Sequence, residues 1–330
     1  MGKINKSITE LVGKTPLLEL TNYEAKENIP AELIVKVEYF NPNQSVKDRI
    51  ALAMIEDAEK RGLLRPGVTI VDTTSGNTGI GLAAIAAAKG YPFRVYIQDQ
   101  VSEERFKSIH AFGAETIKLS DDPGVKKILD ETGGDFVAAI RYLENEVFAD
   151  NPDVVFVNQI GNPANPNIHY LTTGPEIWED TEGKVDIFVS AVGTGGTISG
   201  TGKFLKEKNP DIQIIGVEPG PDSLPSEEHP QPEHEITGVH PFSEKIPREM
   251  IPPTLDQNIY DEIIDVEALD AYEVVRKIAK TDGILLGESS GAAIYAATQV
   301  ARRPENKGKR IVVIAADSGL RYLSTALFGE

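Results

Sequence analysis

A lysine occupies a position where the electrostatics of a helix disfavour a cation. Lys47 lies in the stretch Asn41–Arg49 (NPNQSVKDR), and Ser45 with Asp48 has the spacing of a capping box, which makes Ser45 the expected N-cap. Lys47 would then lie in the first turn, where the helix dipole disfavours a cation by about 0.3–1 kcal/mol. Either Asp48 offsets the charge of a solvated lysine, or the site needs a lysine whose pKa is lowered, because a neutral amine can form a Schiff base.

A glycine-rich stretch, Gly193–Thr197 (GTGGT), follows the apolar run Ile187–Val192 and precedes the helical pattern Ser199–Lys206. A glycine turn between a strand and a helix presents backbone N–H groups and a helix N-terminus to an anion, typically a phosphate. It is not a Walker A loop, because Lys203 follows Gly202 but the first glycine of that motif is missing further upstream. It is not GxGxxG either, because Ile198 occupies the position of the last glycine. The spacing indicates a phosphate-binding loop of unspecified kind or a tight turn between strand and helix.

A second loop, Thr73–Gly79 (TTSGNTG), follows the apolar run Val68–Val71 and is almost entirely polar. So many donors before a helix would lack partners unless a ligand takes them. The following Gly79–Ala84 fits GxGxxA, with Asp99 about twenty residues further on, which is a dinucleotide-binding pattern. Against that interpretation, its first glycine lies seven residues past Asp72, too far for a pyrophosphate turn.

Short β-rich runs alternate with helical patterns along the chain. The predicted strands are Leu33–Val37, Val68–Val71, Phe93–Ile97, Thr116–Leu119, Val154–Val157, Ile187–Val192, Ile212–Val217 and Ile311–Ala315. The predicted helices include Asp48–Arg61, Glu103–Phe112, Glu267–Lys280 and Ala292–Ala301. Strands separated by helices imply an α/β fold with parallel sheets and helices on both faces. The segment Pro219–Pro253, rich in Pro, Glu and His, is predicted to be a surface loop region.

Bulk properties exclude several classes of function. The 330 residues suffice for two sub-domains, and 40% apolar with 25% charged residues is typical of a soluble globular protein. A net charge of −18 argues against nucleic acid as a partner. The absence of cysteine removes disulfides, thiolate metal sites and a cysteine nucleophile, and the five histidines show no zinc-site spacing. Without an apolar leader or a membrane-length apolar run, a cytoplasmic protein with no membrane partner is expected.

Together these stretches resemble the fold-type II (tryptophan synthase β-like) pyridoxal-phosphate enzymes, specifically the cysteine synthase (O-acetylserine sulfhydrylase) and cystathionine β-synthase family. The resemblance runs essentially from end to end, and its motifs occur in the family's order. They are Gly13–Leu17, Asn41–Arg49, Thr74–Gly79, Asn162–Pro166 with His169 and Tyr170, Thr173–Ile177, Gly193–Gly202, Glu288–Ala293 and Arg321–Thr325.

The resemblance assigns a role to each motif. Lys47 matches the lysine that carries pyridoxal 5′-phosphate as a Schiff base, which gives the first-turn lysine a purpose. Asn77 matches the residue that bonds the ring hydroxyl, and Ser289 the one that faces the pyridine nitrogen. The loop matched to the cofactor phosphate comprises Gly193, Thr194, Gly195, Gly196 and Thr197. The residues matched to the substrate carboxylate are Thr74, Ser75, Gly76, Asn77 and Thr78, with Gln159.

The resemblance also implies the reaction and the partners. The parent activity is a β-replacement that makes L-cysteine from O-acetyl-L-serine and sulfide through an aminoacrylate, with cystathionine synthesis or release of sulfide from cysteine as alternatives. A larger domain, residues 1–47 plus 156–330, would bind the cofactor, and a smaller mobile domain, residues 48–155, would close over the substrate. A homodimer is expected, and family members also bind serine acetyltransferase. The distant alternatives are an NAD-dependent oxidoreductase and a non-catalytic partner protein.

This chain departs from the family pattern at four places. Val101–Phe106 differs from the usual mobile segment, Ile160 follows Gln159 where phenylalanine is usual, Gly238–Phe242 replaces a glycine-rich run, and Glu288 replaces an aliphatic residue. These departures leave the leaving group and the nucleophile open.

Overall fold

The computed structural model describes residues 4–74, 76–97, 103–226 and 232–329. The chain forms two α/β units. The smaller unit comprises residues 47–165, 246–254 and the described part of 1–12, and the larger unit comprises residues 13–46, 166–245 and the described part of 255–330. The smaller unit thus includes Lys47, residues 156–165, residues 246–254 and the described part of 1–12, all of which the sequence-based division assigned to the larger domain.

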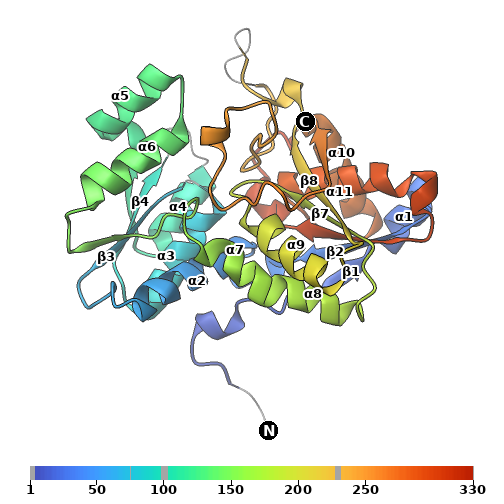
Figure 1. The fold of residues 1–330 in the computed structure, drawn as a ribbon, viewed down its shortest axis with the longest axis horizontal. Coiled ribbons are helices and arrows are strands. Elements are labelled where there is room, and N and C mark those ends of the chain that lie inside the picture. Colours follow the sequence, from blue (N-terminus) through green and yellow to red (C-terminus); the bar gives the residue numbers. More distant parts are fainter. Residues whose placement is uncertain (1–3, 75, 98–102, 227–231, 330) are drawn as a thin grey trace. The chain divides into compact units, whose positions relative to one another are not determined.

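A mainly parallel sheet forms the centre of the larger unit (Figure 1). Its strands, in spatial order, are β1 (Leu17–Glu19), β2 (Glu32–Val37), β10 (Arg310–Ala315), β7 (Ile187–Ala191), β8 (Gln213–Pro219) and β9 (Glu262–Val266). Only β1 pairs antiparallel. The inner strands are almost wholly buried, as expected for parallel strands that helices cover on both faces.

Helices of the larger unit cover both faces of this sheet. They are α1 (Thr21–Glu27), α8 (Gly174–Asp180), α9 (Gly196–Lys208), α10 (Ala268–Thr281) and α11 (Glu288–Ala301). Side chains Ile187 and Val189 of β7 join the core formed with α10 and α11. The alternate residue Phe188 is equally buried but does not belong to that cluster. The alternation of strand side chains therefore fills two layers, one on each face of the sheet.

The smaller unit is built on a parallel sheet of four strands. Their spatial order is β5 (Glu115–Lys118), β4 (Phe93–Ile97), β3 (Thr69–Thr73) and β6 (Val154–Phe156). The helices of this unit are α2 (Lys47–Lys60), α3 (Asn77–Lys89), α4 (Glu103–Ala111), α5 (Pro123–Thr132) and α6 (Phe136–Tyr142). The short helix α7 (Ala164–Ile168) and a π-helical turn, His169–Thr173, follow at the passage into the larger unit.

The dinucleotide pattern GxGxxA lies inside a helix and does not form a turn. Residues 79–84 belong to α3. A Cβ added at Gly81 would lie 3.2 Å from the Ala51 Cβ, so this glycine lets α3 approach α2 closely. A pyrophosphate turn must precede its helix, so the dinucleotide interpretation is wrong in its structural premise. Asp99, its proposed ribose partner, lies outside the described residues.

The proline-rich segment Pro219–Pro253 is irregular, as predicted, but it is not only a surface loop. Its described residues contain two 3-10 turns and no longer helix. Ile236, Val239 and Phe242 are nevertheless buried, and the first two belong to the main core of the larger unit. Residues 236–242 of this segment are therefore packed into the larger unit near the β7–α9 junction.

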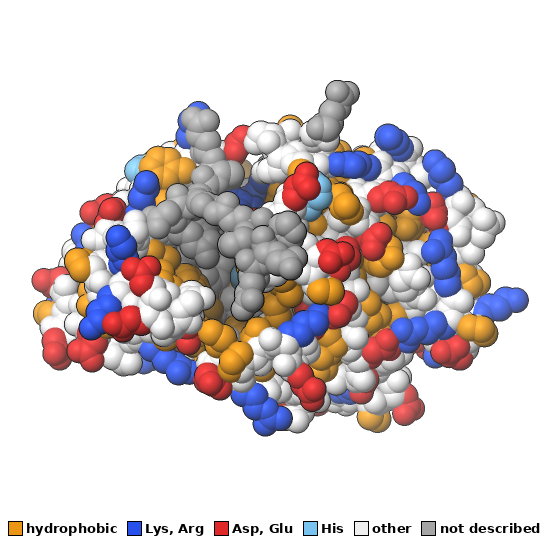
Figure 2. Space-filling model, turned by 90° about the horizontal axis from the view of Figure 1, so that it is seen from above, with side chains coloured by type: hydrophobic (Ala, Val, Ile, Leu, Met, Phe, Trp, Pro, Cys, Tyr) orange, Lys and Arg blue, Asp and Glu red, His pale blue; other side chains and the backbone are white. Residues whose placement is uncertain are grey.

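Charged side chains of both signs are interspersed over the described residues of the face shown in Figure 2. Elsewhere among the described residues, charged side chains form ion pairs, including Lys206 with Asp261 at 2.7 Å and Arg303 with Glu262 at 2.6 Å. Among the described residues, no helix combines the length and the apolar character that crossing a membrane requires. Those residues also contain no cluster of acidic and histidine side chains suited to a metal ion.

Candidate active site

In the smaller unit, a short loop joins β3 to the 13-residue helix α3. The helix begins at Asn77, and Gly76 at its N-cap has an extended backbone. The Thr74 N–H donates to the carbonyl of Tyr96 at 3.0 Å, and the Gly76 N–H to the Thr74 hydroxyl at 3.3 Å. Ser75 lies outside the described residues. A helix N-terminus at the carboxyl end of a parallel strand is suited to binding a carboxylate or a phosphate.

Gln159 is brought to this same loop, because β6 runs parallel to β3 and both strands end at one edge of the sheet. Its Oε1 accepts a hydrogen bond from the Thr78 hydroxyl at 2.6 Å, and its Nε2 donates to the carbonyl of Thr73 at 3.1 Å. The carbonyl of Gln159 accepts from the Asn165 side chain at 2.7 Å. These contacts fix the orientation of the amide and leave a second Nε2 hydrogen beyond the bond to Thr73.

Asp72 is a buried carboxyl group directly beneath the loop. It is fully buried, one oxygen accepts from the Thr73 N–H at 2.8 Å, and the other oxygen, Oδ2, has no hydrogen-bond partner. Burial raises the pKa of Asp72 to about 7, although the backbone N–H groups of Thr73 and Gln159 act in the opposite direction. Asp72 was not among the site residues predicted from the sequence. An acidic residue at the end of an apolar strand is nevertheless a signal of an unusual carboxyl group.

Lys47 is the first residue of α2, so its predicted place in a first helical turn is confirmed. The helix begins one residue later than an N-cap at Ser45 would require. Ser45 instead forms an isolated bridge with Asp317, and the Val46 N–H donates to the carbonyl of Ala316 at 2.8 Å. These main-chain bonds fix the segment that leads into Lys47, whose side chain is half-buried.

In the larger unit, the glycine loop joins β7 to the 13-residue helix α9. Gly195, at the N-cap, has a φ of 84°, a left-handed conformation that favours glycine. A Cβ at Gly195 would also collide with the Leu255 side chain, and one at Gly193 with the carbonyl oxygen of Gly238. Thr194 lies between these two glycines, and Gly196 is the first residue of α9. The close approach of Leu255 and Gly238 therefore requires glycine at positions 195 and 193 and restricts the conformation of the loop.

Thr197, the second residue of α9, contacts a buried histidine. Its hydroxyl lies 3.2 Å from Nε2 of His169, whose Nδ1 lies 2.9 Å from the hydroxyl of Thr173. His169 is only 1% exposed. Sequence reasoning placed His169 and Thr173 within family motifs but gave them no role.

Ser289 lies in the first turn of α11, which follows the N-cap Gly287. Gly287 donates its N–H to the carbonyl of Asp317, just beyond β10, so the start of α11 lies at the carboxyl edge of the sheet. The glycine loop lies at the same edge, because β7 runs parallel to β10. Ser289 is partly exposed, whereas Ser290 is fully buried and its hydroxyl has no hydrogen-bond partner.

Glu288, the unusual acid beside Ser289, supports the segment next to the glycine loop. Its carboxylate is buried and accepts from the Thr237 N–H at 2.8 Å. The Tyr272 hydroxyl donates to the carbonyl of Glu235 at 2.6 Å, and burial followed by the charge of Glu288 raises the pKa of Tyr272. Three residues after Thr237, the His240 N–H donates to the carbonyl of Val192 at 2.9 Å. Glu288 therefore helps to hold the turn that contacts Gly193.

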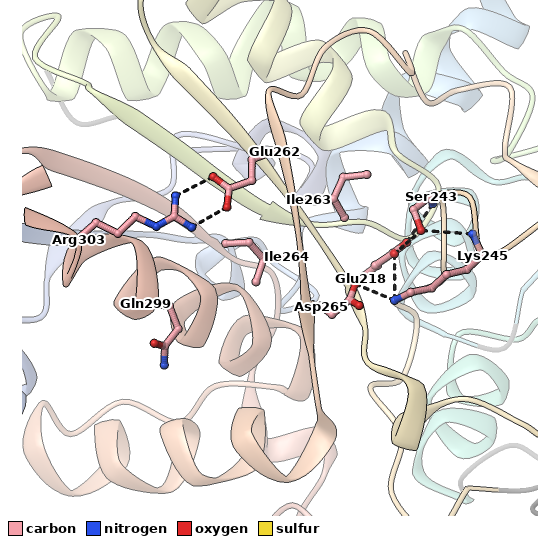
Figure 3. Close-up of a pocket in the computed structure, with 9 residues that line it drawn as sticks. All are labelled: Glu218, Ser243, Lys245, Glu262, Ile263, Ile264, Asp265, Gln299 and Arg303. Atoms are coloured by element: carbon pink, nitrogen blue, oxygen red, sulfur yellow. Dashed lines mark hydrogen bonds and ion pairs between the residues drawn. The ribbon is translucent and has the colours of Figure 1, made fainter. Parts of the chain in front are cut away.

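A polar cavity of about 550 Å³ lies along the edge strand β9 (Figure 3). Its lining includes Glu218, Lys245, Glu262 and Arg303, whose charges are paired within the cavity. Burial alone would raise the pKa of Glu218, but hydrogen bonds from Ser243, Phe242 and Lys245 outweigh it and hold the pKa below its usual value. The residues predicted to do chemistry do not line this cavity. Beside it, the Ser243 N–H donates to Glu218 at 3.0 Å and Lys245 pairs with Glu218 at 3.1 Å, which holds the segment that follows His240.

The predicted residues thus gather at one sheet edge in each unit. Those in the smaller unit are Thr74, Gly76, Asn77, Thr78 and Gln159, and those in the larger unit are Gly193, Thr194, Gly195, Gly196, Thr197 and Ser289. Lys47 belongs to the smaller unit as the first residue of α2. Open α/β folds bind ligands at the carboxyl ends of their strands. Within each unit, the residues predicted from separate motifs lie where a ligand of this fold class would bind.

Comparison with known proteins covers the whole chain. Residues 8–317 match the family model described as pyridoxal-phosphate dependent enzyme. A cysteine synthase from Staphylococcus aureus strain Mu50 is 44% identical over 323 residues, 98% of this chain and 96% of that protein. Among solved structures, cysteine synthase from Entamoeba histolytica has a TM-score of 0.84 at 40% identity, covering 99% of this chain and 91% of that one.

A hydrogen sulfide-producing enzyme from Fusobacterium nucleatum is similar to the same extent. Its TM-score is 0.83 at 39% identity, and the match covers 98% of this chain and 99% of that one. These matches confirm the predicted fold-type II architecture of two α/β units. The chain belongs to the family of pyridoxal-phosphate dependent enzymes.

Proposed function

We propose that the protein is a cysteine synthase, which makes L-cysteine from O-acetyl-L-serine and sulfide by β-replacement. The observation that carries this proposal is the 44% identity with a cysteine synthase over nearly the full length of both chains. The hydrogen sulfide-producing relative supports a second candidate, release of sulfide from cysteine, which uses the same fold.

The residues of the larger unit fit pyridoxal 5′-phosphate. The loop before α9 offers backbone N–H groups, a helix N-terminus and the Thr197 hydroxyl to the phosphate, while Gly193 and Gly195 are fixed by their neighbours. Ser289 is the accessible serine at the start of α11 and would face the pyridine nitrogen. From the smaller unit, Asn77, the first residue of α3, would bond the ring hydroxyl.

The remaining residues would bind the amino acid and move its proton. When bound, the cofactor supplies an electron sink for the α-carbon of the substrate. The substrate carboxylate would lie on the N-terminus of α3, between Thr74, Ser75, Gly76, Asn77 and Thr78 and the Gln159 amide. The Lys47 amine would hold the cofactor at rest and would then remove the α-proton, and the helix N-terminus favours the neutral form of that amine. Acetate would then leave the β-carbon of the substrate, and sulfide would add at that carbon.

Turnover with a matrix of substrates tests this proposal. We expect cysteine formation from O-acetylserine and sulfide to be faster than any reaction of O-phosphoserine, serine or cysteine, each tried with sulfide or homocysteine. Faster sulfide release from cysteine would favour the second candidate, and faster cystathionine formation would indicate a cystathionine β-synthase. A purified protein that takes up no pyridoxal 5′-phosphate, judged by its visible spectrum, would overturn all three.

Gln159→Ala is expected to weaken amino-acid binding and leave cofactor binding nearly intact. The variant loses one hydrogen bond to a charged carboxylate, which is worth about 1.5–3 kcal/mol, or roughly ten- to hundred-fold in affinity. Spectral titration of the cofactor-loaded protein with O-acetylserine measures the change. Gln299→Ala is the matched control, since Gln299 lines the separate cavity at β9. Equal affinity of the Gln159 variant and the wild type would refute the role.

Ser289→Asp is expected to retain the cofactor but to lose most β-replacement activity. A carboxylate at position 289 would keep the pyridine nitrogen protonated and make the cofactor ring a stronger electron sink. The neutral hydroxyl of Ser289 would leave that nitrogen unprotonated and the ring a weaker electron sink, which is sufficient for elimination of a good leaving group. Ser289→Ala should be milder, because it loses one neutral hydrogen bond, worth about 0.5–1.5 kcal/mol. Steady-state rates and bound cofactor are the measurements, and full activity of Ser289→Asp would contradict the argument.

At the neighbouring residue Ser290, the control substitution should be alanine and not aspartate. Ser290 is fully buried, so an aspartate there would destabilise the fold by burying a charge, whatever its effect on the ring. Ser290→Ala removes a hydroxyl that has no hydrogen-bond partner and should change neither stability nor turnover by much.

The resemblance supports three further proposals about the protein in the cell. It would act in the cytoplasm as a homodimer, and it would bind the C-terminal tail of serine acetyltransferase. Sedimentation velocity tests the dimer, and competition between an acetyltransferase tail peptide and O-acetylserine tests the partnership. The mobility of residues 48–155 stays a prediction, which small-angle scattering with and without amino acid can check.

A further inference from the structure

The contacts of His169 restrict which of its nitrogens carries a proton. The hydroxyl of Thr173 is fully buried, and the hydrogen bond that the structure gives it is the one to His169 Nδ1, at 2.9 Å. A buried hydroxyl hydrogen needs an acceptor, because an unmade hydrogen bond costs about 1–3 kcal/mol. If Thr173 donates, Nδ1 accepts, and the proton of the neutral imidazole must lie on Nε2.

The proton on Nε2 then determines the direction of the Thr197 hydroxyl. Nε2 lies 3.2 Å from the Thr197 oxygen and, as a donor, uses one of its acceptor positions. The Thr197 hydrogen cannot point back at His169 and remains available to a ligand at the start of α9. The opposite tautomer would make Nε2 an acceptor, so that Thr197 would donate to the histidine and offer the ligand only a lone pair.

We infer that His169 is a positioning residue, held as the Nε2–H tautomer by Thr173, that turns the Thr197 hydroxyl into a donor for the phosphate of the cofactor. This inference rests on the proposed function, because it takes the ligand at the glycine loop to be pyridoxal 5′-phosphate. A phosphate accepts hydrogen bonds and does not donate strongly at neutral pH, so only the donor orientation of Thr197 contributes to binding. His169 itself does not touch the ligand.

Nitrogen-15 NMR of the histidine-labelled, cofactor-loaded protein reads the tautomer directly. The expected result is a protonated Nε2 and an unprotonated Nδ1 for the signal that disappears in His169→Gln. In Thr173→Val, which removes the hydroxyl that lies 2.9 Å from Nδ1, the two tautomers should become mixed. A protonated Nδ1 in the wild type would overturn the inference.

Cofactor affinity gives the second measurement. Reconstitution of the apoprotein should show a dissociation constant for pyridoxal 5′-phosphate raised about ten- to hundred-fold in Thr197→Val, from the loss of one hydrogen bond to a charged group. Thr173→Val should give a smaller rise in the same direction. The double variant Thr173→Val with Thr197→Val should have nearly the same dissociation constant as Thr197→Val alone, because both substitutions act through the Thr197 hydroxyl.

A matched control exists in the smaller unit. There, His110 Nε2 lies 2.9 Å from the Thr116 hydroxyl, an exposed histidine–threonine pair. Thr116→Val should leave cofactor affinity unchanged. If the wild type bound no pyridoxal 5′-phosphate, the proposed function would fail; if it bound normally and Thr173→Val had wild-type affinity, only the role of His169 would fail.

Discussion

Lys47→Ala is expected to lose steady-state turnover by about 10³-fold or more, because the variant lacks both the amine that would hold the cofactor and the base that would remove the α-proton. General acid–base catalysis alone contributes about 10²–10⁴-fold, and covalent catalysis adds to it. Initial rates with O-acetylserine and sulfide measure the loss. The fold should survive, since alanine is a good helix former and the substitution removes a cation from the positive end of α2.

Chemical trapping tests the same assignment without relying on activity. Borohydride reduction of the cofactor-loaded wild type, followed by peptide mapping, should find the cofactor on Lys47. Lys60, in the last turn of the same helix, provides the matched control. Lys60→Ala should keep both turnover and the labelled peptide. Label on any other lysine would remove Lys47 from the mechanism.

Much of the fold could be predicted because its strands are buried on both faces. The largely apolar runs of β2, β4, β7, β8 and β10 are what parallel strands require, and the predicted ends differ from the observed ones by at most two residues. Two strands escaped prediction. β1 has only three residues and is mostly exposed, and β9 (EIIDV) is an edge strand with charged residues in its run. Edge strands need less apolar surface, so their pattern is weak.

The site was predictable wherever its chemistry depends on local sequence. The first-turn position of Lys47 and the glycine loop before α9 follow from spacing between neighbouring residues. The contacts of His169 and Glu288 could not be predicted in this way, because each residue contacts a partner far away in the chain, Thr197 and Thr237 respectively. A sequence shows the residue types but not these pairings.

Asp72 shows the same limit and carries the largest expected effect on stability. Its pKa is about 7 in the folded protein, against an ordinary value of 3.8. The folded state therefore holds the proton more tightly than the unfolded chain, so the stability linked to this proton is complete below about pH 3.8. It is lost as the pH rises through 7. A shift of this size corresponds to about 4 kcal/mol across that range, since one pKa unit is about 1.4 kcal/mol.

Asp72→Asn should remove this dependence and stabilise the protein at alkaline pH. The amide stays neutral at every pH, and its oxygen can still accept the Thr73 N–H. Relative to the wild type, the variant should gain more in denaturant midpoint at pH 8.5 than at pH 5.5. Asp130→Asn, at an exposed position in α5, should show no such difference. Equal gains at both pH values would mean that Asp72 does not change its protonation between pH 5.5 and 8.5, and would refute the expected titration near 7.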